Sequence, residues 1–149
     1  MNFSDFIGNT PIIRLNNEDD SNSASIWAKL ENLNFNGAHT DRVGIAAIEK
    51  AEKENLINPG ATTLVEHSDG NMGISLACFC REKGYKLIVV VPDYINEERI
   101  NNINAYEAEV LSDKDPKEKA LELVERNNNY YLINKVEEGI REDINYLYT

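Results

Sequence analysis

Residues 62–92 read TTLVEHSDGNMGISLACFCREKGYKLIVVVP, and this stretch decides the fold. It predicts a strand over Thr62–Glu66 and a helix over Met72–Lys83, which Gly84 closes in a left-handed conformation. A second strand is predicted over Leu87–Val91. This strand is apolar throughout, which is typical of a strand buried on both faces of a parallel sheet.

The same alternation continues toward the C-terminus. Proline in the first turn and an asparagine cap favour two further helices, and apolar runs favour two further strands. From Thr62 the order is β-α-β-α-β-α-β, so right-handed crossovers predict an α/β fold with a parallel sheet of about four strands and helices on both faces. The predicted segments are Glu97–Tyr106 (cap Asn96), Ala108–Leu111, Pro116–Asn127, Tyr130–Ile133 and a last helix over Glu137–Leu147.

Toward the N-terminus, two further strands and one helix complete the prediction. Pro11–Leu15 and Ser25–Leu30 are predicted strands, joined by a polar loop that contains Asn16 to Asn22. The first long helix covers Asp41–Asn55 and ends before the Asn58-Pro59-Gly60 stop. Without a linker or an internal repeat, we expect residues 1–149 to form a single domain.

Composition excludes several classes of function. The net charge of −11 provides no basic stripe for nucleic acid. The apolar run at Leu87–Pro92 is too short to span a bilayer, and no secretory signal is expected. Cys78 and Cys80 are expected to be reduced in a cytoplasmic protein, and two histidines make a histidine-rich metal site an unfavourable hypothesis. Charge alone favours solubility over docking to a basic partner.

Two loops carry candidate chemistry. Ser68-Asp69-Gly70-Asn71-Met72-Gly73 follows a strand and opens a helix, where backbone N–H groups can bind an anion. The second loop runs from Asn34 to Arg42 and leads into the first long helix. Either loop alone is weak evidence, because such turns recur in many α/β folds. His39 and His67 flank the loops, so they either line one small cleft or lie idle in solvent.

Several motifs in one order are specific. They are Ile7-Gly8-Asn9-Thr10-Pro11, Lys29-Leu30-Glu31, Asn34…Gly37…Asp41-Arg42, Gly70-Asn71…Gly73, Gly84-Tyr85-Lys86-Leu87 and Glu98-Arg99. This order resembles the cysteine synthase (O-acetylserine sulfhydrylase) family of fold type II pyridoxal-phosphate enzymes. The resemblance runs from about Phe6 to the C-terminus, and it covers only the N-terminal part of a family member.

The resemblance implies a known arrangement of the site. Such enzymes hold pyridoxal phosphate (PLP) as a Schiff base on a lysine just before the Asp-Arg pair. They bind the substrate carboxylate on a Thr-Ser-Gly-Asn-Thr-Gly loop, whose asparagine contacts the 3′ oxygen of the cofactor. A later loop that grips the phosphate and a serine that contacts the pyridine nitrogen belong to the part of the family that this chain does not match.

The chain departs from the family at the lysine. Position 40 is Thr40, which has no amine and cannot form an imine. We interpret Thr40 as a helix N-cap, with Asp41 favourable in the first turn. The sequence therefore predicts no catalytic residue and no bound cofactor, with PLP expected only if the family activity were retained.

The carboxylate loop departs as well. Asp69 places a negative charge where a substrate carboxylate would sit, and Met72 removes a hydroxyl donor. Asn71, Gly70 and Gly73 remain, so the loop Ser68 to Gly73 is expected to keep its shape as a vestigial substrate loop, with Asn71 as a vestigial cofactor contact. The family also has a glycine near Glu107, and its loss predicts a changed helix ending.

These departures predict a truncated cysteine-synthase-like pseudoenzyme that acts by protein binding. Its partner would be a full-length cysteine synthase, one of that enzyme's partners, or a second copy in a homo-oligomer. Two alternatives stay open: an acidic inhibitor or immunity-type protein for a basic partner, and one half of a split PLP-dependent enzyme of cysteine biosynthesis. The tyrosines near the C-terminus either pack the last strand and helix or form a partner patch; they are Tyr130, Tyr131, Tyr146 and Tyr148.

Overall fold

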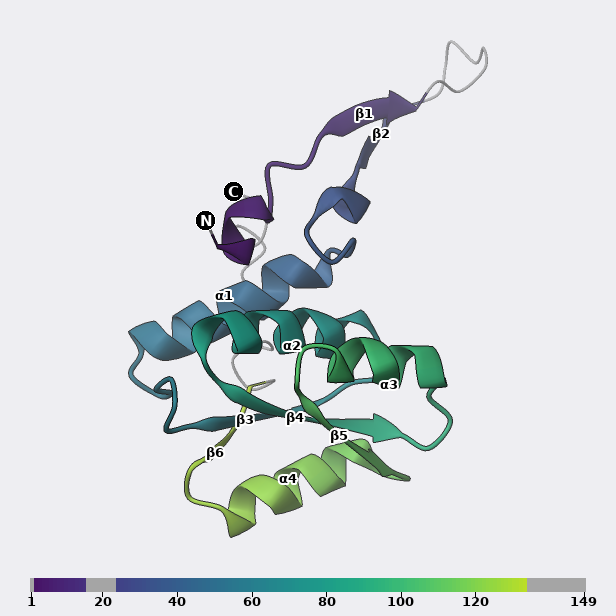
Figure 1. Cartoon of the computed structure of the whole chain (residues 1–149). Helices are drawn as coiled ribbons and strands as arrows, with labels where there is room; N and C mark the ends of the chain where they lie inside the picture. Colours follow the sequence, from purple (N-terminus) through teal and green to yellow (C-terminus); the bar gives the residue numbers. More distant parts are fainter. Residues whose placement is uncertain (1, 16–23, 134–149) are drawn as a thin grey trace.

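A computed structural model describes residues 2–15 and 24–133 (Figure 1). Its centre is a four-stranded parallel sheet, as the sequence predicts, and the strands lie in the order β5-β4-β3-β6, which was not predicted. The strands are β3 (Thr63–His67), β4 (Lys86–Pro92), β5 (Glu109–Asp113) and β6 (Tyr130–Leu132). The helices are α1 (Thr40–Lys53), α2 (Asn71–Lys83), α3 (Glu97–Asn104) and α4 (Pro116–Arg126).

The helices form two layers around this sheet. Figure 1 shows α1, α2 and α3 on one face and α4 on the other. Alternate residues of β4 serve the two layers, with Val89 and Val91 in the larger core and Ile88 and Val90 in the smaller one. Phe79 of α2 is fully buried in the larger core. The prediction of helices on both faces is confirmed.

Local capping explains where the helices begin and end. The Asn96 side chain accepts a hydrogen bond from the Arg99 N–H at 3.0 Å, and Pro116 stands in the first turn of α4, both as predicted. Asp115 also caps α4 by accepting from the Glu118 N–H at 3.0 Å, which the sequence analysis did not identify. Gly84 closes α2 with φ of 80°, the predicted left-handed conformation.

The end of α3 differs from its prediction. The helix stops at Asn104, two residues before the predicted Tyr106. Glu107 then adopts φ of 64°, in the left-handed region that glycine reaches without steric cost. The backbone thus keeps a geometry suited to glycine while the sequence supplies a glutamate.

The N-terminal part of the chain forms an arm that projects from the sheet and helices (Figure 1). We define this N-terminal arm as residues 3–15 and 24–35. Its strands are β1 (Ile12–Leu15) and β2 (Ile26–Lys29), which pair antiparallel and confirm the two predicted strands. The 3-10 helices η1 (Phe3–Phe6) and η2 (Glu31–Leu33) were not predicted.

A partly buried ion pair holds the base of the arm to the body. Glu31 accepts hydrogen bonds from Arg42 Nε at 2.7 Å, Thr10 Oγ1 at 2.6 Å and Asn34 Nδ2 at 2.9 Å. The side chains of Arg42 and Glu31 are only 10% and 18% exposed. The Arg42 hydrogen bond is the main reason why the pKa of Glu31 falls to about 2.

Three other predictions have different outcomes. Cys78 and Cys80 are free thiols buried in the core. Tyr130 and Tyr131 are partly buried against the cores, which supports the packing interpretation, whereas Tyr146, Tyr148 and the helix predicted over residues 137–147 lie outside the described residues. No helix in the described ranges has the length and apolarity needed to cross a membrane.

Candidate functional site

A cleft of about 600 Å³ opens at the carboxyl ends of β3, β4 and β5. Ligands of open parallel sheets bind at this edge, because the loops that follow neighbouring strands converge there. The cleft brings Thr40 together with most of the predicted substrate loop. Its lining is Thr40, Glu66, His67, Ser68, Asp69, Gly70, Asn71, Met72, Pro92, Tyr94, Lys114, Asp115, Pro116 and Lys117.

Thr40 belongs to a short chain of hydroxyl groups that ends on a carboxylate. Ser75 Oγ donates to Oδ1 of the fully buried Asp41 at 2.6 Å. Thr40 Oγ1 lies 3.0 Å from Ser75 Oγ. A serine hydroxyl has one proton, and the Ser75 hydroxyl directs that proton to Asp41 in its hydrogen bond. Thr40 is therefore the donor in the hydrogen bond between Thr40 and Ser75. Position 40 is therefore a satisfied hydroxyl within the structure of the domain.

The interpretation of Thr40 as an N-cap is wrong. α1 begins at Thr40, and no N-cap side chain bonds the first turn. The chain is already helical at His39, with φ of −65° and ψ of −23°, so the Asp41 and Arg42 N–H groups bond to the carbonyls of Ala38 and His39. Asp41 lies in the first turn as predicted, and it accepts from the Asn36 N–H at 2.7 Å.

The predicted substrate loop keeps a tight turn. Ser68 Oγ accepts from the N–H groups of Gly70 and Gly73, each at 3.2 Å, so the loop's own hydroxyl occupies two donors at the start of α2. Gly73 packs closely, because an added Cβ would lie 3.1 Å from Cγ1 of Val89. Arg99 donates to the carbonyl oxygen of Asp69 and ties the loop to α3.

The exposed tip of this loop carries Asp69 and Asn71, while Met72 is buried beneath it. Both Asp69 and Asn71 line the cleft. The tip thus presents a carboxylate and an amide to a ligand. The predicted role of Asn71 as a vestigial cofactor contact stays a prediction.

The residues present do not fit a PLP imine in the manner that the resemblance implies. An imine forms on an amine, and position 40 offers a hydroxyl that Ser75 already accepts. The two amines in the cleft, Lys114 and Lys117, come from a different segment, between the end of β5 and the start of α4. No step of PLP chemistry is therefore assigned to these residues.

Half of the residues that line the cleft were not predicted from the sequence. Pro92 and Tyr94 follow β4, and Lys114 to Lys117 follow β5. The predicted parallel sheet already contained the signal, since the carboxyl ends of parallel strands meet at one edge. Glu66, only 2% exposed at the end of β3, also lines the cleft.

The two histidines do not line one cleft together. His67 lines the cleft, whereas His39 is an exposed residue outside its lining. Among residues 2–15 and 24–133, no three His, Cys, Asp or Glu side chains gather closely enough to hold a metal ion.

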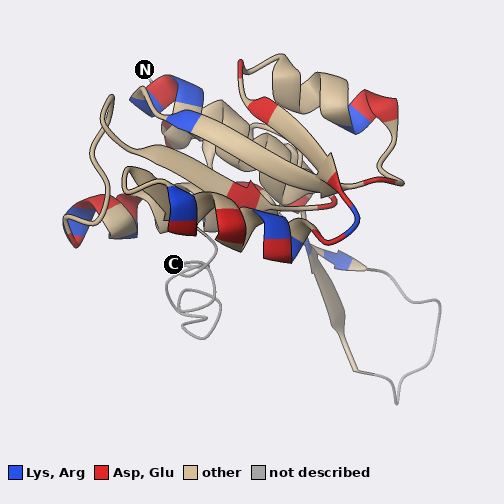
Figure 2. Ribbon diagram, turned by 90° about the horizontal axis from the view of Figure 1, so that it is seen from below, with Lys and Arg blue, Asp and Glu red and all other residues tan. Residues whose placement is uncertain are grey.

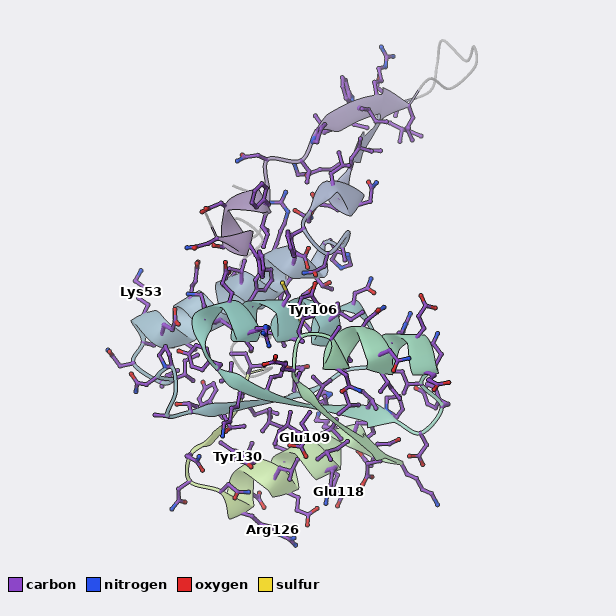
Figure 3. All side chains as sticks on the ribbon, in the orientation of Figure 1. Lys53, Tyr106, Glu109, Glu118, Arg126 and Tyr130 are labelled. Atoms are coloured by element: carbon purple, nitrogen blue, oxygen red, sulfur yellow. The ribbon has the colours of Figure 1, made fainter. Side chains whose placement is uncertain are left out.

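Burial keeps the nearby thiols and phenol protonated. Desolvation raises the pKa of the Cys78 and Cys80 thiols, so neither is a ready nucleophile at neutral pH. Burial also raises the pKa of Tyr106, which is labelled in Figure 3 and donates from its hydroxyl to Asn36 Oδ1 at 3.0 Å. These groups connect α2, the end of α3 and the loop before α1, and they serve packing.

Comparisons with known proteins agree with this geometry. The family described as "Pyridoxal-phosphate dependent enzyme" matches residues 3–145. Cysteine synthase of Staphylococcus aureus is 44% identical over 110 residues, which are 74% of this chain and 35% of that protein. A probable cysteine synthase of Bacillus subtilis is 40% identical over 137 residues, which are 88% of this chain and 44% of that protein.

Solved structures give the same result. The crystal structure of a hydrogen sulfide-producing enzyme from Fusobacterium nucleatum superposes with a TM-score of 0.80 at 39% identity, covering 90% of this chain and 45% of that one. O-ureido-L-serine synthase superposes with a TM-score of 0.80 at 31% identity, covering 89% of this chain and 43% of that one. The chain spans less than half the length of these relatives. It belongs to the cysteine synthase family of fold type II pyridoxal-phosphate dependent enzymes.

Proposed function

We propose that this chain is a non-catalytic member of the cysteine synthase family that acts by binding a protein. The observation that carries the proposal is the hydroxyl at position 40. Thr40 donates to Ser75, which donates to the buried Asp41, so the start of α1 is stabilised without an amine. A family member without that amine has no covalent attachment for its cofactor.

The charges of the cleft support the same proposal. Asp69 lies at the exposed tip of the loop, and its carboxylate repels the carboxylate of an amino-acid substrate. Ser68 Oγ occupies the N–H groups of Gly70 and Gly73, which reduces the donors available to an anion. Lys114 and Lys117 also line the cleft and bring positive charge to it, which Asp115 offsets in part.

The partner that we propose is a full-length cysteine synthase or one of its binding partners. The family's sequence pattern matches residues 3–145, while more than half of the relatives' length is not matched. A chain that keeps the family's surfaces and lacks its amine can still dock where a family member docks. We place this role in the cytoplasm, because Cys78 and Cys80 are free thiols.

A spectroscopic experiment tests the non-catalytic half of the proposal. The purified chain is mixed with PLP, reduced with borohydride and mapped by mass spectrometry, with Lys114→Met and Lys117→Met variants as controls. We expect the visible absorbance of free PLP and only the scattered labelling that surface lysines give. Stoichiometric labelling of one lysine in the cleft, or sulfide-dependent cysteine formation by this chain alone, would contradict the proposal.

A binding experiment tests the other half. Immobilised chain is challenged with a full-length cysteine synthase at micromolar concentration, with an unrelated protein of similar net charge as the matched control. We expect selective retention of the cysteine synthase that survives 0.15 M salt, where long-range charge effects are screened. A family-specific partner would be refuted if the immobilised chain retained the control protein as well as the cysteine synthase, or if it retained no cysteine synthase.

A further inference from the structure

A second hollow opens at the amino ends of the parallel strands, at the edge of the sheet that faces away from the cleft. We call it the amino-edge groove; its volume is about 800 Å³. The first residue of each of the four strands lines it, and the described linings of the cleft and of this groove share no residue. The four first residues are Thr63, Lys86, Glu109 and Tyr130.

The strand register places these four side chains on one face of the sheet. Thr63 pairs with Lys86 on one side and with Tyr130 on the other, and Glu109 pairs with Ile88, two residues after Lys86. Side chains two positions apart in a strand share a face, and Ile88 packs in the smaller core with α4. All four side chains therefore lie on the α4 side of the sheet, where Figure 3 labels Glu109 and Tyr130.

Lys86 and Glu109 bring opposite charges to a sheet that has few. Figure 2 shows the strands mostly in tan, with the charged residues concentrated on helices and loops. Within the described bounds of the four parallel strands, Lys86 is the only lysine or arginine, and Glu109 is the only acidic residue among the first two positions of each strand. One strand across and two residues along the sheet separate their Cα atoms by roughly 8 Å.

These two charges are available to a ligand. No ion pair within residues 2–15 and 24–133 uses either side chain, and both residues are exposed. The other two charged residues of the groove, Arg81 and Glu107, form an ion pair with each other. Glu107 makes this pair from a left-handed backbone conformation that suits glycine. The pair neutralises itself and leaves Lys86 and Glu109 as the unpaired charges of the groove.

Two hydroxyl groups add hydrogen-bonding capacity beside these charges. Thr63 and Tyr130 stand in register next to Lys86, and no side-chain hydrogen bond of the described residues uses either hydroxyl. The hydroxyls of Tyr85 and Tyr106, by contrast, already donate to side chains outside the groove. The α4 side of the groove thus offers a cation, an anion and two hydroxyls.

We propose that the amino-edge groove binds a free α-amino acid as its zwitterion. Lys86 receives the carboxylate, Glu109 receives the ammonium group, and the hydroxyls of Thr63 and Tyr130 bond to the carboxylate oxygens. A free amino acid carries both charges on one carbon, which matches two opposite charges on neighbouring strands. Each end of a longer peptide carries only one of them. The ring of Tyr130 favours an aromatic side chain on the ligand. This site is independent of the proposed protein binding.

An NMR titration with matched probes tests the inference. Isotope-labelled chain is titrated with L-phenylalanine, with L-phenylalanine amide, which lacks the carboxylate, and with N-acetyl-L-phenylalanine, which lacks the ammonium group. We expect saturable shifts of the backbone amides of Thr63, Lys86, Glu109 and Tyr130 with L-phenylalanine. Each analogue should bind about fivefold more weakly, the upper end of the effect of an exposed ion pair.

Variants connect each charge of the probe to one side chain. Lys86→Met should weaken L-phenylalanine about fivefold and leave the amide analogue unchanged, because the amide has no carboxylate to lose. Glu109→Gln should weaken L-phenylalanine likewise and leave the N-acetyl analogue unchanged. Lys53→Met and Glu118→Gln remove exposed charges at other elements, labelled in Figure 3, and are the matched controls. Circular dichroism checks that each variant is folded.

Three outcomes would overturn the inference. The first is the absence of any saturable shift with L-phenylalanine up to its solubility limit. The second is equal affinity for L-phenylalanine and its two analogues, which would show that the charges of the zwitterion are not recognised. The third is a set of shifts confined to the loop Ser68 to Gly73, which would place the amino acid in the cleft. None of these outcomes bears on retention of a cysteine synthase by the immobilised chain.

Discussion

The ion pair between Glu31 and Arg42 gives a stability prediction whose size follows from the structure. The change Glu31→Gln keeps the shape of the side chain and removes its charge. It leaves the guanidinium of Arg42, only 10% exposed, without the carboxylate that accepts from Nε at 2.7 Å and Nη2 at 3.1 Å. A partly buried cation that loses its carboxylate destabilises the folded state, because the remaining hydrogen bond to Thr10 Oγ1 at 3.2 Å does not replace the lost negative charge.

The magnitude follows from proton linkage. The pKa of Glu31 is lowered from 4.5 to about 2. At 1.36 kcal/mol per unit this corresponds to at most about 3 kcal/mol, and solvent access to a side chain that is 18% exposed reduces the expected loss to about 2 kcal/mol. A loss of that size lowers the melting temperature of a chain this long by about 4–8 °C.

The sign with pH is fixed by the direction of the shift. A lowered pKa in the folded state adds stability that is complete above pH 4.5 and disappears as the pH falls toward 2. Urea denaturation followed by circular dichroism should show the full difference between wild type and Glu31→Gln at pH 7 and a shrinking difference between pH 4.5 and pH 2. A difference that is independent of pH, or none at pH 7, would refute the reasoning.

Glu122 provides the matched control for this experiment. It pairs with Lys119 at 2.8 Å and with Arg126 at 2.7 Å, and these partners lower its pKa as well. The pairs lie at the exposed surface of α4, on the side of the molecule where Figure 3 labels Arg126. Solvent screens such pairs, so Glu122→Gln should leave the denaturation midpoint nearly unchanged.

Three further changes test the site and the fold. Ser75→Ala removes the buried hydroxyl that accepts from Thr40 and donates to Asp41. It should lower the free energy of unfolding by about 1–3 kcal/mol in urea denaturation, against about 1 kcal/mol for Thr40→Val. Equal losses in the two variants would contradict the deduced direction of donation. Gly73→Ala introduces a Cβ 3.1 Å from Val89 and 3.3 Å from Ile103, and should destabilise by about 1–3 kcal/mol, whereas a neutral result would show that this packing yields. Glu107→Gly relieves a positive φ of 64° and should raise the melting temperature by about 2–4 °C in a thermal scan. A decrease would mean that the exposed ion pair between Glu107 and Arg81 contributes more stability than the strained backbone costs.

Much of the fold could be predicted because local signals agree with its layers. The apolar run of β4 predicts a strand buried on both faces, and the structure buries Leu87 to Pro92. Asn96, Pro116 and Gly84 mark helix ends through short-range backbone chemistry that no distant residue alters. The end of α3 was predicted two residues too late, because periodicity does not report where a turn begins.

The sequence alone determined that position 40 has no amine, that the chain carries an acidic charge, and that strands and helices alternate, because these are properties of composition and local spacing. Only the tertiary structure showed that Thr40 donates into a chain ending on Asp41, and that Lys114 and Lys117 line the same cleft as the Ser68 loop. Only the structure showed, too, that the paired strands β1 and β2 carry exposed apolar side chains. Thr40 and Ser75, which are 35 positions apart, come together through helix packing, and the segments that line the cleft come together through sheet order. No local pattern encodes these contacts.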